Sequence, residues 1–319
     1  RKQATAIASH ATGMDISVER IDLRFPLNLL VHGVLVVQPE DSVRHVQHPD
    51  TLLSLGSLNV HVQAWPLLEG KIKVDGFTLK QATVNSSNLL EGIRIKGALG
   101  HFFLATHGID LNTEEAVLGD VQLSDTHMQV ILADTSQTPK DTAETALNWR
   151  ISLHALKLKN VSVDLHMPLD SMYLTTHIAN AELNNADADL KRHFYGWRRF
   201  LLSGASVNYD TGHTTFRTAI PTNSTNVKPT EGFDPSHIVL HDIRLSIDSM
   251  LYGSKEMNAV IRECSMYERS GLSITSLTGH FFADSTRIRI PSLKLLTPHS
   301  EMSLAAHAHR EALTLSATG

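Results

Sequence analysis

Histidines are the residues of this chain that could most readily perform acid–base or metal chemistry, and the sequence of 319 residues contains 19 of them. The closest pairs are His45 and His48, His237 and His241, and His307 and His309. Residues two apart share a face of a strand, so only His307 and His309 could chelate from one strand. No cysteine or carboxylate at ligand spacing accompanies any pair, and we therefore expect no metal site. The histidines are interpreted as ordinary polar side chains of a solvent-facing surface.

Motifs of catalysis are absent from the sequence. There is no GxxxxGK[ST] phosphate loop, no GxGxxG after a strand, no GxSxG and no HExxH. Cys264 is the single cysteine, so it cannot form an internal disulfide, and a lone thiol of this kind is usually a small buried apolar side chain. We expect a protein that is not an enzyme and that uses no cofactor.

Composition narrows the class of protein further. Lys and Arg number 28 against 33 Asp and Glu, the net charge is −5, and no basic block of the kind that binds nucleic acid is present. Hydrophobic residues make up 42% of the chain, enough for a core. No apolar stretch approaches the roughly 20 residues that a spanning helix needs. The chain begins Arg1-Lys2-Gln3 without a signal peptide, and we expect a fragment from which an anchor or export signal was removed.

Apolar residues recur in a specific spacing: apolar-x-apolar, two further residues, then apolar-x-apolar. The copies comprise Ile16, Val18, Ile21 and Leu23; Leu53, Leu55, Leu58 and Val60; Ile72, Val74, Phe77 and Leu79; Ile151, Leu153, Leu156, Leu158, Val161, Val163 and Leu165; Ile238, Leu240, Ile243 and Leu245; and Ile288, Ile290, Leu293 and Leu295. Alternation places every second side chain on one face of a strand. A gap of three returns to that face only if a bulge or bend takes up one extra residue.

The spacing predicts a mainly β fold, with long strands that are apolar on one side and bent in the middle. Such strands build a curled antiparallel sheet with few short helices. An ordinary β-sandwich or barrel with bulges is the alternative, whereas a leucine-rich repeat is excluded because the units have no fixed period. Helix is plausible at 1–10, at 141–146 and, as the only longer candidate, at Ala186–Phe200, although Gly196 interrupts it.

Two segments of similar β units are expected along the chain. Residues 1–135 form the first and residues 149–319 the second, continuous with it, with a linker at 136–148. The tetrapeptide Gly-His-Phe-Phe occurs in both, at Gly100–Phe103 and Gly279–Phe282. Residues 221–235 are polar, contain three prolines and are expected to form an exposed loop.

The ordered set of short phrases resembles the AsmA-like superfamily and, within it, the translocation and assembly module (TamB) family of Bacteroidetes type. The phrases are Thr12–Val18, Ile21–Leu27, Asp50–Leu53, Leu58–Val62, Leu67–Ile72, Tyr267–Leu272 and Leu295–Ser300. The resemblance covers nearly the whole chain. The chain differs from the family pattern because it lacks the family's membrane helix and long C-terminal continuation.

The resemblance implies a β-taco, or repeating β-groove: an elongated, curled antiparallel sheet with an apolar interior. Similar proteins are periplasmic and anchored in the inner membrane. They are implicated in moving phospholipid between the inner and outer membranes and in outer-membrane protein translocation and assembly. An inner-membrane helix and a C-terminal segment that meets an outer-membrane barrel of the Omp85 type are implied to lie outside this chain. The family has no catalytic residues to carry over.

The candidate ligands are therefore phospholipid acyl chains, held on the apolar members of the recurring units. These candidates are Ile16, Val18, Ile21, Leu23, Leu53, Leu55, Leu58, Val60, Ile72, Val74, Ile151, Leu153, Leu156, Leu158, Val161, Val163, Leu165, Ile243, Leu245, Ile288, Ile290, Leu293 and Leu295. Two other functions are kept open. One is a chaperone or scaffold that pairs exposed sheet edges with strands of outer-membrane β-barrel proteins. The other is a structural or adhesive β-solenoid with a closed core.

Overall fold

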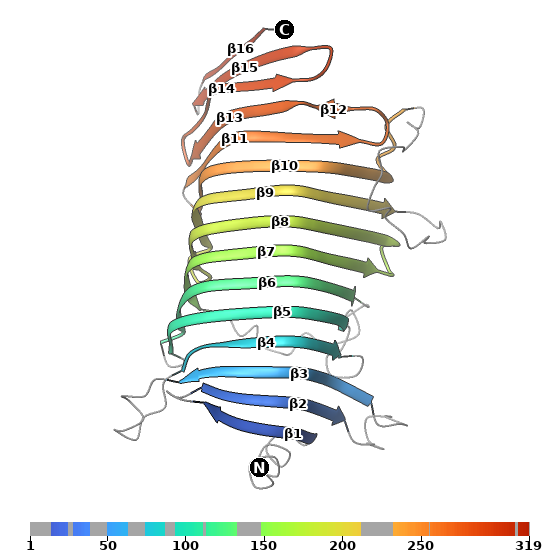
Figure 1. Ribbon diagram of the computed structural model, residues 1–319. Coiled ribbons are helices and arrows are strands. Elements are labelled where there is room, and N and C mark those ends of the chain that lie inside the picture. The colour runs from blue at the N-terminus through green and yellow to red at the C-terminus, as the bar shows by residue number, and fades with distance from the viewer. Residues whose placement is uncertain are drawn as a thin grey trace. The chain divides into compact units, whose positions relative to one another are not determined.

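The structure, a computed structural model, describes residues 14–24, 28–38, 50–62, 74–86, 93–110, 113–132, 148–211, 232–254, 256–309 and 312–318. Nearly all of these residues lie in strands, and none of them is helical (Figure 1). The strands are β1 (Asp15–Arg24), β2 (Asn28–Gln38), β3 (Asp50–Val62), β4 (Val74–Asn85), β5 (Ile93–Asp110), β6 (Glu115–Leu132), β7 (Arg150–Met167), β8 (Met172–Asp189), β9 (Phe194–Thr211), β10 (His237–Tyr252), β11 (Glu256–Glu268), β12 (Ser273–Ile274), β13 (Ser276–Asp284), β14 (Arg287–Leu296), β15 (Glu301–His309) and β16 (Ala312–Thr318).

The strands pair antiparallel in the order of the chain, as one sheet, with the short β12 paired beside β11. The sheet is not closed, because β1 and β16 each have a single partner. The fold class predicted from the apolar spacing, a mainly β curled antiparallel sheet, is therefore confirmed. The chain divides into two compact units, one holding β1–β6 with Lys157–Pro168 and the other Glu144–Leu156 with β8–β16. Each is described by itself below.

The predicted bends are present in the strands. In the first unit the residues Glu19, Gly33, Gly56, Gln81, Gly100 and Asp125 lie opposite one another on successive strands, with regular cross-strand pairs on either side, and we call this set the bend line. Gly33, Gln81 and Asp125 on alternate strands of this line have left-handed backbone, with φ of 59°, 54° and 51°. A left-handed residue interrupts the alternation, which is why the apolar positions are separated by three residues there.

Glycine stands opposite the left-handed residues because two side chains do not fit at the bend line. A Cβ on Gly100 would lie 2.8 Å from the Cβ of Asp125. A Cβ on Gly33, itself left-handed, would lie 2.3 Å from the Glu19 side chain.

Asn160 in β7 is also left-handed (φ 53°) and donates a hydrogen bond to Asp125, 2.8 Å from Nδ2 to Oδ1.

Other gaps in the apolar spacing coincide with irregular pairing. In β10 the register shifts between Leu240 and Ile243, where Asp242 is left-handed (φ 51°). In β14 it shifts between Ile290 and Leu293. These are the bulges that the recurring spacing requires, and the curvature of the long strands is visible in Figure 1.

The helix considered at Ala186–Phe200 is wrong. These residues form the end of β8, the turn at Leu190–His193 and the start of β9, with Ala186 opposite Trp197. Cross-strand pairing of aromatic and apolar side chains here outweighs the helix propensity of Ala, Leu, Lys and Arg. The short helices considered at 1–10 and 141–146 lie outside the described residues. In the part of the chain that the structure describes, no helix is long and apolar enough to cross a membrane.

Candidate functional site

The apolar residues of the first unit line up across the strands in continuous rows. From β1 to β6, the rows are Ile16, Val36, Leu53, Val84, Gly97 and Met128; Val18, Val34, Leu55, Ala82, Leu99 and Thr126; Ile21, Val31, Leu58, Leu79, Phe102 and Leu123; and Leu23, Leu29, Val60, Phe77, Leu104 and Val121. Directly opposed residues point to the same side of a sheet. The bend line runs between the second and third rows, and its extra residue returns the next apolar side chain to the same side of the sheet. All four rows therefore lie on one face, which we call the apolar face.

The second unit has an apolar face of the same construction. From β8 to β11, its rows are Ala181, Leu202, Leu245 and Cys264; Leu183, Phe200, Ile247 and Ile261; Ala186, Trp197, Met250 and Ala259; and Ala188, Tyr195, Tyr252 and Met257. Aromatic pairs link neighbouring positions, with ring centroids 6.2 Å apart for Tyr195 and Tyr252 and 6.5 Å for Trp197 and Phe200. Further along, Leu293 pairs with Leu304 and Ile288 with Ala308.

The apolar face is more buried than its surroundings but is not covered. Small residues at its centre are buried, among them Ala82 at 3% exposure and Ala205 at 2%. No large side chain among the described residues is less than 2% exposed, and Leu23 (72%) and Ile288 (45%) are open to solvent. A second packed layer would bury large side chains completely. The described residues therefore supply no such layer over the face of either unit.

The candidate residues from the recurring units are buried to different depths. Leu55 and Val161 are buried, whereas Ile21, Leu23 and Ile288 are exposed. Half-buried positions are occupied by Ile16, Val18, Leu53, Leu58, Val60, Ile151, Leu153, Leu156, Leu158, Val163, Leu165, Ile243, Leu245, Ile290, Leu293 and Leu295. Val74 is the first residue of β4, and Ile72 lies outside the described residues.

Sequence reasoning missed the contributions of β2, β5, β6, β8 and β9 to the apolar face. In β2 and β5 the apolar residues run on without clean alternation, as in NLLVHGVLVVQ, so the facing positions do not stand out. In β8 the positions are filled by alanines such as Ala181 and Ala186. The signal that could have found them is their pairing with strands that do show the spacing.

The opposite, polar face carries the histidines in ordinary ion pairs. His127 lies 3.4 Å from Asp164, and His237 lies 3.3 Å from Asp210 and 3.1 Å from Asp234. The backbone N–H of Ser236 and the neighbouring His237 hold the pKa of Asp234 below its ordinary value, against a smaller effect of burial.

The histidine pairs considered from the sequence do not converge on a metal. His241 hydrogen-bonds Asp242 at 2.9 Å and stacks on Tyr267, whereas His237 contacts other carboxylates, those of Asp210 and Asp234. His307 pairs with Arg289 across strands. His45 and His48 lie outside the described residues. Within the described part of the chain, no group of three or more His, Cys, Asp or Glu side chains is placed to hold a metal ion.

Two titratable groups lie on or beside the apolar face of the second unit. Burial raises the pKa of the Cys264 thiol, which lies opposite Leu245. Glu268, opposite Leu240, is only 6% exposed. Burial raises its pKa most strongly, but hydrogen bonds from the backbone N–H and hydroxyl of Ser270, with the charge of Arg269, bring that pKa below its ordinary value. Glu268 therefore stays ionised and marks where the apolar face gives way to polar groups.

The chemistry available to the apolar face is shielding of hydrocarbon from water, because aliphatic side chains offer neither protons nor ligands. No protein family model matches this chain, and no curated protein matches it in sequence. The function is therefore inferred from the arrangement of its own residues.

Proposed function

We propose that this chain is a non-enzymatic, lipid-binding portion of an envelope protein, which holds phospholipid acyl chains on its apolar face. The observation that carries the proposal is the continuous apolar face, which the described residues leave uncovered in both units. Soluble proteins seldom expose large contiguous apolar surfaces without a binding role. Each methylene that the face removes from water contributes about 0.8 kcal/mol.

The row structure also supports movement of a bound chain. Each row repeats at every strand, at the inter-strand spacing of about 4.8 Å. In the first unit, Leu55, Ala82 and Leu99 offer nearly equivalent apolar contacts one after another. An acyl chain that shifts by one strand loses contacts at one end and gains similar ones at the other, so no large barrier separates neighbouring positions.

The cellular setting is proposed on the resemblance to AsmA-like and TamB proteins. The protein is periplasmic and anchored in the inner membrane by a helix outside this chain. It bridges to the outer membrane for phospholipid transport and for translocation and assembly of outer-membrane proteins. Its outer-membrane partner is a barrel of the Omp85 type, met by a segment outside this chain.

Native mass spectrometry of the purified chain, combined with lipid extraction, tests the proposal. We expect masses that exceed the protein by whole phospholipids, and uptake of lipid from vesicles by a delipidated sample. A delipidated, folded chain that takes up no phospholipid from vesicles would contradict the proposal.

Strand pairing with client proteins is the second candidate function, and it is favoured by the edges of the sheet. Among the described strands, β1 and β16 each pair with one neighbour. The β1 edge carries charged residues such as Glu19 and Arg20, which discourage pairing, whereas β16 (ALTLSAT) has none. Under this function, proline at Ser316 should reduce binding of an unfolded β-barrel client more than a charge on the apolar face does. A closed solenoid would have no such edges.

A further inference from the structure

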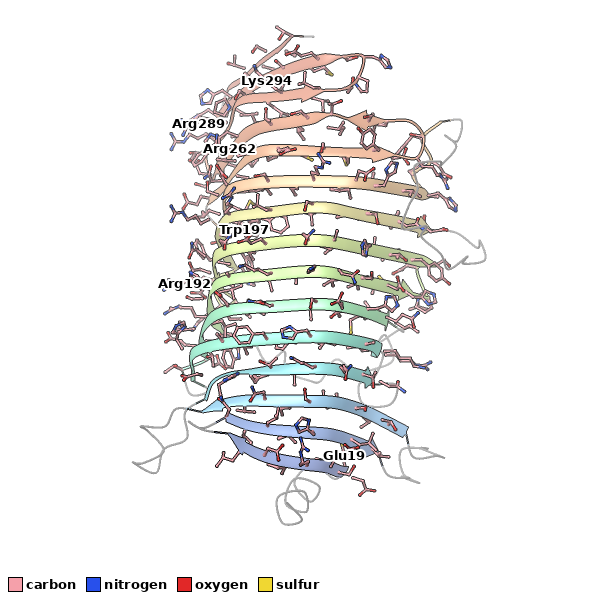
Figure 2. All side chains as sticks on the ribbon, viewed as in Figure 1. Glu19, Arg192, Trp197, Arg262, Arg289 and Lys294 are labelled. Atoms are coloured by element: carbon pink, nitrogen blue, oxygen red, sulfur yellow. The ribbon has the colours of Figure 1, made fainter. Side chains whose placement is uncertain are left out.

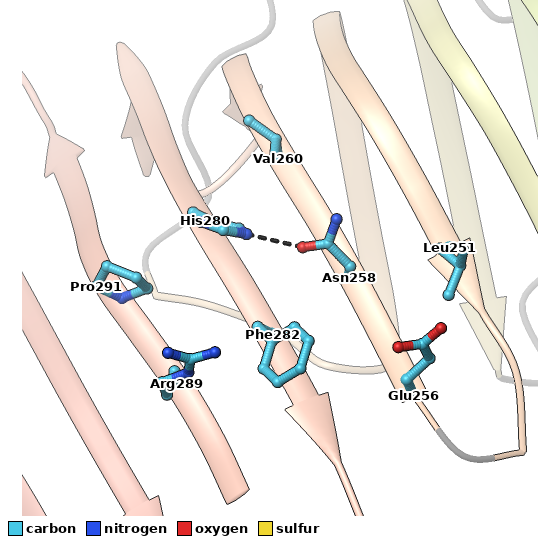
Figure 3. A pocket seen from close by; sticks show the side chains of 8 residues that line it. All are labelled: Leu251, Glu256, Asn258, Val260, His280, Phe282, Arg289 and Pro291. Atoms are coloured by element: carbon cyan, nitrogen blue, oxygen red, sulfur yellow. Dashed lines mark hydrogen bonds between the residues drawn. The ribbon is translucent and has the colours of Figure 1, made fainter.

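A hollow on the polar face of the second unit is not explained by lipid binding. It has a volume of about 450 Å³ and is formed by side chains from β10, β11, β13 and β14 (Figure 3). The lining residues are Leu251, Glu256, Asn258, Val260, His280, Phe282, Arg289 and Pro291. Asn258, Phe282 and Arg289 are directly opposed on successive strands, between the positions of the apolar face.

The hollow contains a cation that lacks a carboxylate partner among the described residues. The guanidinium carbon of Arg289 lies 4.9 Å from the centre of the Phe282 ring. The neighbouring arginines differ: Arg287 pairs with Asp284 at 2.8 Å and Arg262 with Asp248 at 2.5 Å. An arginine held against an aromatic ring presents a planar pair of donors suited to an oxyanion.

An anion stands at the other side of the same hollow. Within the described residues, the carboxylate of Glu256 has no cationic partner, and Figure 3 shows Phe282 between it and Arg289. Two further lining residues, His280 and Asn258, are held together by a hydrogen bond of 2.7 Å between Nε2 of His280 and Oδ1 of Asn258. Apolar side chains complete the lining (Figure 3).

We propose that this hollow binds a short apolar peptide through its two charged ends. A simple anion drawn to Arg289 would meet Glu256, and a simple cation drawn to Glu256 would meet Arg289. A zwitterion satisfies both groups, with its carboxylate on Arg289 and its ammonium on Glu256, and its apolar body rests on Phe282. The two residues stand on β14 and β11, two strand steps apart, and Glu256 lies two residues along β11 from Asn258, which is in register with Arg289, so their Cα atoms are about 12 Å apart. Two extended residues span about 7 Å, and a hydrogen bond of about 3 Å at each end extends this reach to about 13 Å, enough to meet both groups.

The probe is the dipeptide Leu-Leu, titrated into the full chain and followed by NMR or calorimetry, against N-acetyl-Leu-Leu and Leu-Leu-amide. We expect Leu-Leu to bind best, because each capped form leaves one protein charge without its partner. Arg289→Gln should weaken Leu-Leu about tenfold and remove the preference for a free carboxylate. Glu256→Gln should remove the preference for a free ammonium. Arg262→Gln, outside the hollow, is the matched control and should change neither.

Three outcomes of the peptide titrations would overturn the proposal. They are absence of Leu-Leu binding by the folded chain, equal binding of all three peptides, and a loss in Arg289→Gln no greater than in Arg262→Gln. Tighter binding of phosphoethanolamine than of Leu-Leu would also overturn it, since the site would then select another zwitterion. Circular dichroism of each variant separates these results from unfolding. The proposed lipid binding is on the opposite face, so none of these outcomes bears on it.

Discussion

The apolar positions of β7 allow the lipid proposal to be tested with one strand and three adjacent residues. Leu156 and Leu158 are half-buried members of the recurring spacing, and Lys157 between them is exposed. Leu156→Glu and Leu158→Glu each place a carboxylate on the side of β7 that the recurring spacing assigns to the apolar face. Lys157→Gln changes the net charge by the same amount on the other face, and is therefore the matched control.

The size of the effect follows from burial. Complete burial of a leucine side chain is worth about 1.5–3 kcal/mol, so a half-buried one has about 1 kcal/mol left for a ligand to gain. A carboxylate set against hydrocarbon costs at least as much again. The sum, about 2 kcal/mol, corresponds to roughly thirtyfold weaker binding of an acyl chain at that position.

The assay is lipid bound per chain by native mass spectrometry, together with displacement of a fluorescent fatty acid. We expect roughly thirtyfold weaker displacement for either glutamate variant and no change for Lys157→Gln. Circular dichroism should show the same β content in all three, because the substituted positions are not fully buried. Unchanged lipid binding in both glutamate variants, with retained β structure, would refute acyl-chain binding on this part of the apolar face.

Three further predictions concern reactivity, pH and backbone conformation. Burial raises the pKa of Cys264, so its alkylation by iodoacetamide should be slow at pH 7 and several-fold slower with phospholipid present; equal rates with and without lipid would contradict coverage of the face. Hydrogen bonds from Arg287, and from the hydroxyl and N–H of Thr286, hold the pKa of Asp284 well below its ordinary 3.8, so they stabilise the fold above that pH and less as the pH falls. Asp284→Asn should therefore lower the Tm more at pH 7 than at pH 3, and an equal loss at both would argue against this. Asn160 is left-handed, so in urea unfolding Asn160→Gly should be more stable than Asn160→Val by about 1–2 kcal/mol, since both lose the side-chain hydrogen bond and only Val strains the backbone.

The bends of the strands were predictable because the residues that make them leave a mark in the spacing. Asn160 and Asp242 fall inside the gaps of the recurring unit, and Asn and Asp are the side chains that best tolerate left-handed backbone. The alternation of apolar residues also predicted that the recurring units form strands. The spacing did not show which strands pair with one another, which is why neither β5 in the first unit nor β8 in the second was recognised as part of an apolar face.

Sequence reasoning failed where local propensity and cross-strand pairing disagree. Ala186–Phe200 has good helix formers, yet Trp197 and Tyr195 find apolar partners on β8 and β10 that a helix could not provide. The hollow on the polar face was equally invisible in sequence. Glu256 on β11 and Arg289 on β14 line the same hollow because β13 pairs with both strands. No local sequence motif connects the two residues. Side chains project from both faces of the sheet (Figure 2), so a binding site can form on either face.

An apolar sheet face can avoid water by closure of the sheet, by a second protein layer or by a bound molecule. Closure would give every strand two partners, but β1 and β16 have one each. A second layer drawn from the described residues would leave large side chains fully buried, and none of them is. A bound lipid, as proposed above, needs neither closure nor a layer from the described residues. It follows that charges on the face should damage binding more than stability, whereas a closed core would show the reverse, because a charge buried in a packed interior costs several kcal/mol of folding free energy.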